Sequence, residues 1–446
     1  MSVIVSDRRT LVVGLGKTGL SCVRYLCAQG REIAVADSRE NPPGLDELKS
    51  GWPDVPVHTG PFDSELFATF NELIVSPGVS VEIPAIRAAV AKGAQVRGDI
   101  DLFAQAADAP IVAITGSNGK TTVTTLVGDM ARAAGRRVEV GGNIGTPALD
   151  LLGRDADLYV LELSSFQLET TEELNALAAT VLNVSDDHMD RYPSKMEYFQ
   201  AKQRIFRGCK NAIVNLDDAL STPMARDSLK FLCFGFHRVN PDTFSTREDD
   251  QGTWITFGFD NLLLAEDLKL LGRHNISNVM AALALGQAAG LPMDTMLAIA
   301  REFRGLPHRC EFIRRVNDVD YINDSKGTNV GATVAAIESL APASGKIVLI
   351  AGGDSKGADF SPLEAPVTLH CRAVVLIGRD ASRIADNIGK AATVTYADTM
   401  AEAVSQAASL AQPGDRVLLS PACASFDMFR DYSDRGDQFR QQVEGL

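Results

Sequence analysis

The chain has 446 residues, which at roughly 150 residues a domain predicts about three domains, each able to bury a core. With 43 lysines and arginines against 57 aspartates and glutamates its formal net charge is −14, and it has no basic run, so we expect neither nucleic acid nor a membrane surface among its partners. The seven cysteines form no C-x-x-C pair, no apolar stretch approaches the roughly 18 residues of a membrane span, and the first residues lack the form of a signal peptide, which together predict a reduced cytoplasmic protein.

The first block, residues 1–97, is typical of a Rossmann-like domain. An apolar strand in TLVVGLG leads into Gly14, Gly16 and Gly19, a helix follows, and a second strand ends at Asp37. An acidic side chain about 20 residues beyond such glycines commonly meets a ribose hydroxyl. Alone, this pattern indicates a nicotinamide oxidoreductase, or glycines that serve only helix–sheet packing. The phosphate loop that comes later in the chain argues against the oxidoreductase.

The second block, residues 98–305, contains the most informative stretch, IVAITGSNGKTT at residues 111–122. A buried-strand pattern turns through a Gly-rich loop into a helix, which is the arrangement of a triphosphate-binding loop. Backbone N–H groups and Lys120 would hold phosphates, and Thr121 would supply a hydroxyl for Mg²⁺. The spacing G-x-x-x-x-G-K-[ST] requires a glycine where this chain has Ile114. A tight turn without a ligand is the alternative.

Further polar residues of this block lie at the ends of predicted elements. Glu162 ends the apolar strand of DLYVLELSS, where a nucleotide-bound Mg²⁺ would be held, although a solvated or helix-capping glutamate fits the same pattern. His188 lies among acids in DDHMDRY, and a lone histidine is more often a structural residue. Asn278 lies near the start of a helix, where it could reach a base or ribose, or cap the helix.

The third block, residues 306–446, follows the Gly/Pro-marked segment GLPHR, which suits a hinge. YINDSKGTN, KIVLIAGGDSKGADF, RAVVLIGRD and DRVLLSPACASFD each predict a strand that runs into a polar loop, the edge at which open α/β sheets bind ligands. The expected fold is α/β in three domains. These are a Rossmann-like N-terminal domain, a central P-loop ATPase-like parallel sheet with a small additional β-sheet, and a Rossmann-like C-terminal domain that could close over the second.

The motifs together resemble the bacterial Mur ligases. GLGKTGLSC, ITGSNGKTT, GGNIG, ELSSFQLE, DDHMDRY, GLPHR, NDSKGTN, GGDSKGAD and SPACASFD occur in that family's order over essentially the whole chain. The form T-G-[ST]-N-G-K-[ST] is usual there and accounts for Ile114. NDSKGTN and SPACASFD are similar to those of the members that add D-glutamate. The resemblance implies an ATP-dependent amide-bond ligase of peptidoglycan precursor synthesis, which phosphorylates the carboxylate of UDP-N-acetylmuramoyl-L-alanine and lets D-glutamate attack the acyl phosphate.

The resemblance also implies roles for individual residues. ATP would be bound by Gly116, Ser117, Asn118, Gly119, Lys120, Thr121, Thr122, Asn278, Arg309, Asp324 and Lys326. The uridine nucleotide sugar would be bound by Thr18, Asp37, Ser38, Arg39, Gly78, Asn143, Ser164 and Gln167. D-Glutamate would be bound by Thr328, Lys356, Ser425 and Tyr432. Mg²⁺, expected as two ions, would be held by Thr121, Glu162, His188 and Lys202, and the catalytic group would be Lys120, Glu162, His188 and Lys202.

Lys202 in QAKQRIF matches the lysine that these ligases carry as a carbamate. An unmodified lysine is a cation that cannot bind Mg²⁺, whereas addition of CO₂ gives an anionic oxygen donor for a hard metal. From the sequence alone Lys202 would be an exposed helical lysine. We expect a monomer whose partners are the small molecules named above. The alternatives are another Mur ligase or a folylpolyglutamate synthetase, a Rossmann oxidoreductase, and a non-catalytic nucleotide-binding regulator.

Overall fold

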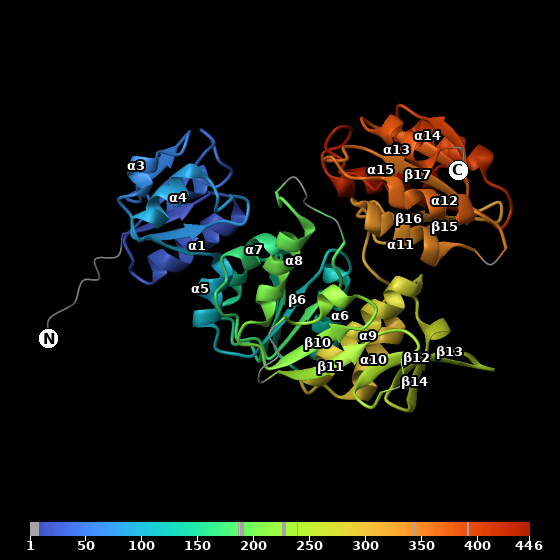
Figure 1. Ribbon diagram of the computed structural model, residues 1–446, viewed down its shortest axis with the longest axis horizontal. Helices are drawn as coiled ribbons and strands as arrows, with labels where there is room; N and C mark the ends of the chain where they lie inside the picture. The colour runs from blue at the N-terminus through green and yellow to red at the C-terminus, as the bar shows by residue number, and fades with distance from the viewer. Residues whose placement is uncertain are drawn as a thin grey trace.

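The computed structural model describes residues 9–185, 187, 191–224, 229–238, 240–342, 344–389 and 392–446. This part of the chain forms three sheets, each flanked by helices. Figure 1 shows three bodies in chain order, with the N-terminal body in blue, the central one in cyan, green and yellow, and the C-terminal one in orange and red. We treat residues 97/98 and 305/306 as proposed domain boundaries.

The N-terminal sheet is entirely parallel, in the order β3-β2-β1-β4-β5. Its strands β1, β2 and β4 are buried along their whole length, as expected for parallel strands covered on both faces. Chain order reverses direction at β1, so the carboxyl ends of β1 and β4 border the crevice in which such sheets bind ligands. The strands are β1 (Thr10–Val13), β2 (Ile33–Asp37), β3 (Val57–Thr59), β4 (Glu72–Val75) and β5 (Gln95–Arg97), and the helices are α1 (Lys17–Ala28), α2 (Leu45–Gly51), α3 (Ser64–Phe67) and α4 (Pro84–Ala91).

The central sheet runs in the order β14-β13-β12-β11-β10-β9-β6-β8-β7. Strands β7 to β11 with β6 are parallel, and β12, β13 and β14 form an antiparallel meander. This meander is the additional β-structure, and it continues the main sheet because β12 pairs with β11 through Cys233–Thr243 and Phe234–Phe244. The strands are β6 (Ile111–Thr115), β7 (Val138–Gly142), β8 (Leu158–Glu162), β9 (Ala178–Val181), β10 (Asn211–Asn215), β11 (Lys230–Phe234), β12 (Thr243–Asp249), β13 (Gly252–Phe257) and β14 (Asp260–Leu264).

Helices of the central body cover both faces of its sheet. They are α5 (Asp99–Ala106), α6 (Lys120–Ala133), α7 (Ser165–Glu169), α8 (Lys195–Gln203), α9 (Arg273–Ala288) and α10 (Met293–Glu302), with 3₁₀ turns at Ala148–Leu151, Arg204–Phe206, Ala219–Ser221 and Ala265–Asp267. One apolar cluster joins this body to the first, since Leu20 and Val23 of α1 pack in the same core as Phe103 of α5 and Leu149. The N-terminal body is therefore docked on the central one through buried apolar surface.

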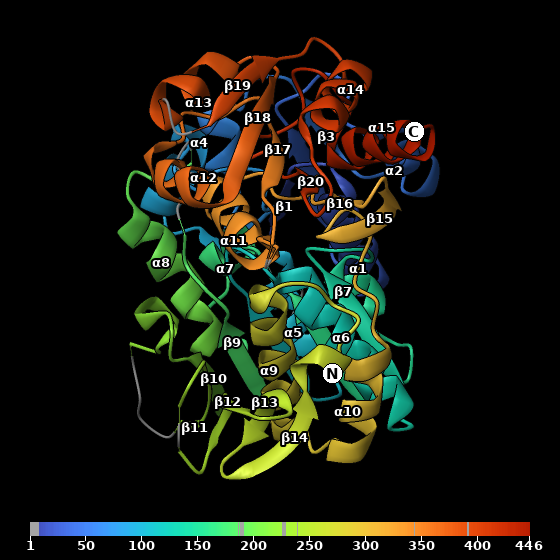
Figure 2. The ribbon, with the colours of Figure 1, turned by 90° about the vertical axis from the view of Figure 1, so that its right-hand side faces the viewer.

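The C-terminal sheet runs in the order β15-β16-β20-β17-β18-β19 and is parallel except for β15. The β15–β16 hairpin turns at Asn317 and Asp318, both with positive φ, as a two-residue turn of the favoured hand requires. Figure 2 shows this body above the central one, with α11 at their junction, where it contacts α9. The strands are β15 (Glu311–Val316), β16 (Val319–Asn323), β17 (Ile347–Gly352), β18 (Cys371–Ile377), β19 (Thr393–Tyr396) and β20 (Arg416–Leu419), and the helices are α11 (Val330–Leu340), α12 (Glu364–His370), α13 (Ala381–Ile388), α14 (Met400–Leu410) and α15 (Tyr432–Glu444), with a 3₁₀ turn at Ser361–Leu363.

Candidate active site

The Gly-rich loop between β6 and α6 has the predicted strand, loop and helix order. Gly119, the residue before α6, has φ +84°, a conformation that L side chains rarely adopt. A Cβ atom on Gly119 would also lie 2.4 Å from Asn278 Oδ1, so the carboxamide of Asn278 packs directly under the loop. Asn278 is buried and its Nδ2 donates to Asn275 Oδ1 at 3.0 Å. The loop can take this shape only with glycine at 119.

The segment after β9 holds the first half of the loop in place. The N–H of Ser117 donates to Asn183 O at 2.9 Å, and the N–H of Asn118 donates to Asn183 Oδ1 at 2.8 Å. Ser117 Oγ also donates to Ser185 O at 3.0 Å and is hydrogen-bonded to the Tyr198 hydroxyl at 3.1 Å. These two amides are thus committed to protein acceptors. The amides in the first turn of α6 have no helical acceptor, and they point toward the place where phosphates bind such loops.

Lys120 and Lys202 converge on a single carbonyl oxygen in this loop. Lys120 Nζ donates to Gly116 O at 2.8 Å and to Ser117 O at 3.0 Å, and Lys202 Nζ donates to Gly116 O at 3.0 Å. Lys202 is only 1% exposed, so the expectation of an exposed lysine is wrong. Helix α8 turns it inward, and its ammonium lies 4.3 Å from the centre of the Tyr198 ring. Burial, and then the charge of Lys120, lower the pKa of Lys202 well below its ordinary value.

Glu162 lies at the end of β8, next to the loop, as the sequence predicts. Its Oε1 accepts a hydrogen bond from Asn143 Nδ2 at 2.8 Å. Its Oε2 is buried and makes no hydrogen bond with any described residue, and the side chain is 2% exposed. Thr121 Oγ1 accepts a hydrogen bond from Arg309 Nη2 of the C-terminal body at 2.5 Å. His188 lies outside the described residues.

These groups line a cavity of about 1270 Å³ between the central and C-terminal bodies. Its walls bring together Gly-rich loop residues, strand-end residues and C-terminal loops that are far apart in the sequence. Among the predicted ligand-binding residues, the lining includes Ser117, Asn118, Gly119, Lys120, Thr121, Asn143, Glu162, Ser164, Lys202, Arg309, Lys326, Thr328, Lys356 and Tyr432. Asn329 Nδ2 of the C-terminal body donates to Asn118 Oδ1 at 3.2 Å and to Asp187 Oδ2 at 3.3 Å across this cavity.

The cavity is basic although the chain as a whole is acidic. Burial lowers the pKa of Lys120 and of Arg309, and nearby Glu162 opposes both shifts. Burial, and then the Arg309 charge, lower the pKa of Lys326 to about 8. Its ammonium lies over the Tyr432 ring, 3.7 Å from the centre. A bound polyanion would stabilise cations that lie this close together. The site is therefore suited to a nucleoside triphosphate and to carboxylate substrates.

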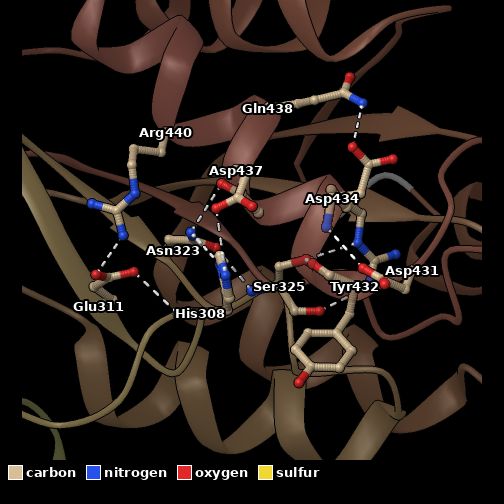
Figure 3. Close-up of polar contacts among 12 residues, drawn as sticks. His308, Glu311, Asn323, Ser325, Asp431, Tyr432, Asp434, Asp437, Gln438 and Arg440 are labelled. Carbon is tan, nitrogen blue, oxygen red and sulfur yellow. Dashed lines mark hydrogen bonds and ion pairs between the residues drawn. The ribbon is translucent and has the colours of Figure 1, made fainter.

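A polar network fixes the C-terminal wall (Figure 3). Ser325 Oγ donates to Tyr432 O at 2.7 Å, and Asn323 Nδ2 donates to Gly436 O at 3.1 Å, so the end of β16 and the loop after it are both tied to α15. The ring of His308, which has φ +62°, lies 3.1 Å from Asn323 Nδ2 and faces Asp437. The network therefore positions the loop that carries Lys326 and Thr328.

The other residues that the sequence predicts for ligand binding lie outside the lining of the cavity. Asp324 accepts from Ser420 Oγ at 2.8 Å and from the Cys310 N–H at 3.2 Å, and burial raises its pKa to about 6. Gly116, Thr122, Ser425 and Gln167 are close to lining residues in the chain but are not in the lining themselves. Gln167 completes a capping box with Ser164 at the start of α7, and its Nε2 donates to Asp99 at 3.0 Å.

The predicted uridine nucleotide residues gather at the carboxyl edge of the N-terminal sheet. Thr18 lies in the first turn of α1, Asp37 ends β2, Ser38 and Arg39 follow it, and Gly78 follows β4. Asp37 accepts from the Leu15 N–H at 2.7 Å and from Arg39 Nε at 2.9 Å. Burial opposes ionisation of Asp37, but these hydrogen bonds hold its pKa below the ordinary value. Asp37 thus shapes the Gly-rich loop while Ser38 and Arg39 remain exposed.

Family comparisons cover most of the chain. The Mur ligase MurD-like N-terminal domain matches residues 8–98, the Mur ligase middle domain matches residues 114–286, and the Mur ligase glutamate ligase domain matches residues 308–423. The chain belongs to the Mur ligase family. The resemblance that the motifs indicate and the expected α/β fold are confirmed, and a Rossmann oxidoreductase is excluded.

Individual relatives of this Mur ligase are similar over their full length. It is 78% identical over 446 residues to the UDP-N-acetylmuramoylalanine--D-glutamate ligase of Marinobacter nauticus and 56% identical over 447 residues to that of Pseudomonas aeruginosa, with 100% of each chain covered. In fold it is similar to a pseudomurein peptide ligase type C from Methanothermus fervidus, with TM-score 0.63 and 17% identity over 98% of this chain and 100% of the other. It is also similar to UDP-N-acetylmuramate-alanine ligase from Thermotoga maritima, with TM-score 0.59 and 19% identity over 98% and 99%.

Several residues that shape the site of this Mur ligase are missing from the sequence prediction. Asn183 and Ser185 fix the Gly-rich loop, and both follow the apolar strand AATV, whose neighbour in the sheet is β6. Tyr198 lies four residues before Lys202 on α8, a spacing that places both on one helix face and could have predicted their contact.

Within the described residues, no helix is long and apolar enough to cross a membrane.

Proposed function

We propose that this Mur ligase joins D-glutamate to UDP-N-acetylmuramoyl-L-alanine with ATP, through an acyl-phosphate intermediate. The observation that carries the proposal is the single cavity in which the Gly-rich loop of the central body faces Lys326, Thr328, Lys356 and Tyr432 of the C-terminal body. The names of the full-length relatives at 78% and 56% identity support the choice of D-glutamate among the amino acids that Mur ligases add.

The first step moves the γ-phosphoryl group from ATP to the acceptor carboxylate and leaves ADP. The obstacle to this step is the repulsion between the acceptor carboxylate and the γ-phosphate, which are both negatively charged. Lys120 of the central body and Arg309 of the C-terminal body both line the cavity, and they would contact the phosphates and stabilise the charge that spreads over the phosphoryl oxygens. The Arg309–Thr121 hydrogen bond shows that the guanidinium reaches the loop from the C-terminal body. Asn278 and Asp324 would contact the adenosine, with Gly116 to Thr122 around the phosphates.

Mg²⁺ fits the residues present. The buried Glu162 Oε2 has no partner among the described residues and is the hard oxygen donor that Mg²⁺ prefers, and Thr121 adds a hydroxyl. When bound, Mg²⁺ would neutralise phosphate charge. We propose His188 and carbamylated Lys202 as further ligands. The lowered pKa of Lys202 favours the neutral amine, whose lone pair can attack CO₂. The nitrogen then loses a proton to solvent, and the product is an anionic carbamate in a basic pocket.

In the second step the amine of D-glutamate attacks the acyl carbon, loses a proton and releases phosphate. Thr328 and Lys356 would bind its α-carboxylate, and Ser425 with the backbone near Tyr432 would bind its side-chain carboxylate. Lys356 has φ +47°, and its N–H donates to Asp354 Oδ1 at 3.0 Å, so the loop holds it in a defined conformation.

The uridine nucleotide would lie at the edge of the N-terminal sheet, bound by Thr18, Asp37, Ser38, Arg39 and Gly78. Asn143, Ser164 and Gln167 would receive the muramoyl portion as it crosses to the cavity. Ser164 and Asn143 line that cavity, which supports this direction of binding. We further propose that the protein is cytoplasmic and that it is a monomer. Sedimentation of the purified protein would test the monomeric state.

Phosphate release tests the proposal directly. The enzyme is supplied with ATP, Mg²⁺ and UDP-N-acetylmuramoyl-L-alanine, and the amino acid is varied among D-Glu, L-Glu, L-Ala, L-Lys and meso-diaminopimelate. We expect turnover with D-Glu alone. Turnover with another amino acid, or none with D-Glu, would overturn the substrate assignment.

The carbamate has a separate test. Lys202→Ala is expected to be inactive and to regain activity when short carboxylic acids such as formate or acetate replace the missing carboxylate oxygens. Lys210→Ala, at an exposed lysine of the same body, is the matched control and should stay active. Absence of rescue with an intact fold would contradict the carbamate.

A further inference from the structure

Arg191 lies between the N-terminal and central bodies, directly after the acidic DDHMD motif. We propose that Arg191 is a positioning residue for the uridine nucleotide, because its guanidinium fastens the turn that carries Gly78 to helix α7 of the central body. The inference rests on the proposed function, in which Gly78 contacts the uridine diphosphate.

The guanidinium contacts both bodies at once. Nη1 donates to Pro77 O at 3.3 Å and Nη2 donates to Val79 O at 3.2 Å, so it brackets Gly78 through the carbonyls on either side. Nη2 also donates to Glu169 Oε2 at 2.9 Å, at the end of α7. The guanidinium carbon lies 4.6 Å from the centre of the Phe166 ring. The Arg191 side chain is only 17% exposed, which protects these hydrogen bonds from water.

The turn that Arg191 holds is part of the proposed uridine pocket. Ser76 opens the turn. Its N–H donates to Val13 O at 2.9 Å and its Oγ donates to Gly14 O at 2.9 Å. A Cβ atom on Gly14 would lie 2.9 Å from Ser76 Cβ, so the Gly-rich loop after β1 and the turn after β4 are in close contact. Fixing the turn therefore fixes both loops that border the crevice.

On the side of the central body, the contacts of Arg191 continue through neighbouring side chains to the ATP loop. Glu169 accepts a second hydrogen bond from the Tyr192 hydroxyl at 2.5 Å, and Tyr192 stacks on Phe166 with ring centres 5.8 Å apart. Tyr192 also packs on Tyr198 at 5.2 Å, and Tyr198 is hydrogen-bonded to Ser117 of the phosphate loop. Arg191 thus links the uridine turn to the ATP loop through packed side chains.

Arginine is required at this place by geometry. The two Nη atoms of one planar guanidinium reach two backbone carbonyls and one carboxylate, while the face of the group lies on an aromatic ring. A lysine presents a single ammonium on a flexible stem and cannot reproduce these contacts. The substitution Arg191→Lys should therefore keep the charge and lose the fixation of the turn.

Steady-state kinetics of Arg191→Lys and Arg191→Met test the proposal. We expect KM for UDP-N-acetylmuramoyl-L-alanine to rise about 10- to 100-fold, the effect of a misplacement of about 1 Å, with KM for ATP and D-glutamate within about twofold of wild type. Arg24→Met is the matched control, because Arg24 also joins the two bodies, through Asp150 at 2.5 and 3.2 Å, but does not touch the turn. It should leave all three KM values near wild type.

Two further measurements separate the possible failures. Amide hydrogen exchange in the peptide that spans residues 73–80 should become faster in Arg191→Lys and stay unchanged in Arg24→Met. Equal changes in all three KM values, or unchanged exchange, would overturn the proposal. Asp37→Asn reports on the uridine pocket: if it raises KM for the uridine substrate while Arg191 variants do not, the positioning role is wrong and the proposed function stands. No D-glutamate-dependent turnover in the wild type would instead refute the function.

Discussion

Arg435 on α15 provides a quantitative test of how the C-terminal wall is held. It is fully buried, at 0% exposure. Its Nε donates to Ser325 Oγ at 3.0 Å, its Nη2 to Ser325 O at 2.8 Å and its Nη1 to Cys423 O at 3.2 Å. All three acceptors are neutral oxygens. Arg435 thereby joins the loop before Lys326, the loop before Ser425 and the helix that begins with Tyr432.

The expected effect of Arg435→Met follows from these contacts. Three hydrogen bonds from a charged donor stabilise the fold by about 1.5–3 kcal/mol each. Against this, burial lowers the pKa of Arg435 from its ordinary value of about 12.5 to about 10, which at about 1.4 kcal/mol for each pKa unit corresponds to a cost of about 3 kcal/mol for the charged form. Methionine removes both contributions, so we expect the C-terminal body to lose about 1.5–6 kcal/mol of stability.

Calorimetry and hydrogen exchange measure this loss. The two tryptophans, Trp52 and Trp254, lie outside the C-terminal body, so their fluorescence does not report its unfolding. Exchange in peptides covering residues 320–330 and 418–436 should accelerate in Arg435→Met, and KM for D-glutamate should rise. Arg440→Met is the control on the same helix, because its ion pair with Glu311 is partly exposed and is worth less than about 1 kcal/mol. Equal or greater stability in Arg435→Met would refute the reasoning.

Three more outcomes are expected. As pH rises through about 8 the ammonium of Lys326 is lost, so KM for ATP should rise between pH 7 and 9 in the wild type, and this rise should be absent in Lys326→Gln. Gly119→Ala should abolish ATP binding in calorimetric titration, whereas Gly135→Ala, with φ +78° but open space around a Cβ atom, should lose about 1 kcal/mol of stability and still bind ATP. Glu162→Gln should raise the Mg²⁺ concentration for half-maximal activity at least about 10-fold, since even outer-shell metal partners contribute that much, and an unchanged value would contradict the ligand role.

The sequence predicts features that depend on neighbours along the chain. The start of α6 at Lys120, the end of β2 at Asp37 and the end of β8 at Glu162 follow from apolar runs and glycines within a dozen residues. The carboxyl ends of parallel strands meet at one edge, so these positions also indicate where ligands bind.

Local sequence patterns do not predict features that depend on contacts between distant segments of the chain. Arg435 has the polar surroundings of a surface helix in its sequence, and only the closure of two loops over α15 buries it. Lys202 resembles an exposed lysine until α8 is packed against the phosphate loop. The joining of β12 to β11 through two residue pairs decides whether the extra strands form a separate sheet, and no local signal encodes that pairing.

The split of the basic groups between two bodies has a consequence for energy use in the cell. Lys120 belongs to the central body, but Arg309 and Lys326 reach the cavity from the body that also carries the proposed D-glutamate loops. Full charge stabilisation of phosphoryl transfer then needs both bodies in contact. A nucleotide bound while the two bodies are apart would meet an incomplete set of cations, so its hydrolysis would be slow until the bodies are joined.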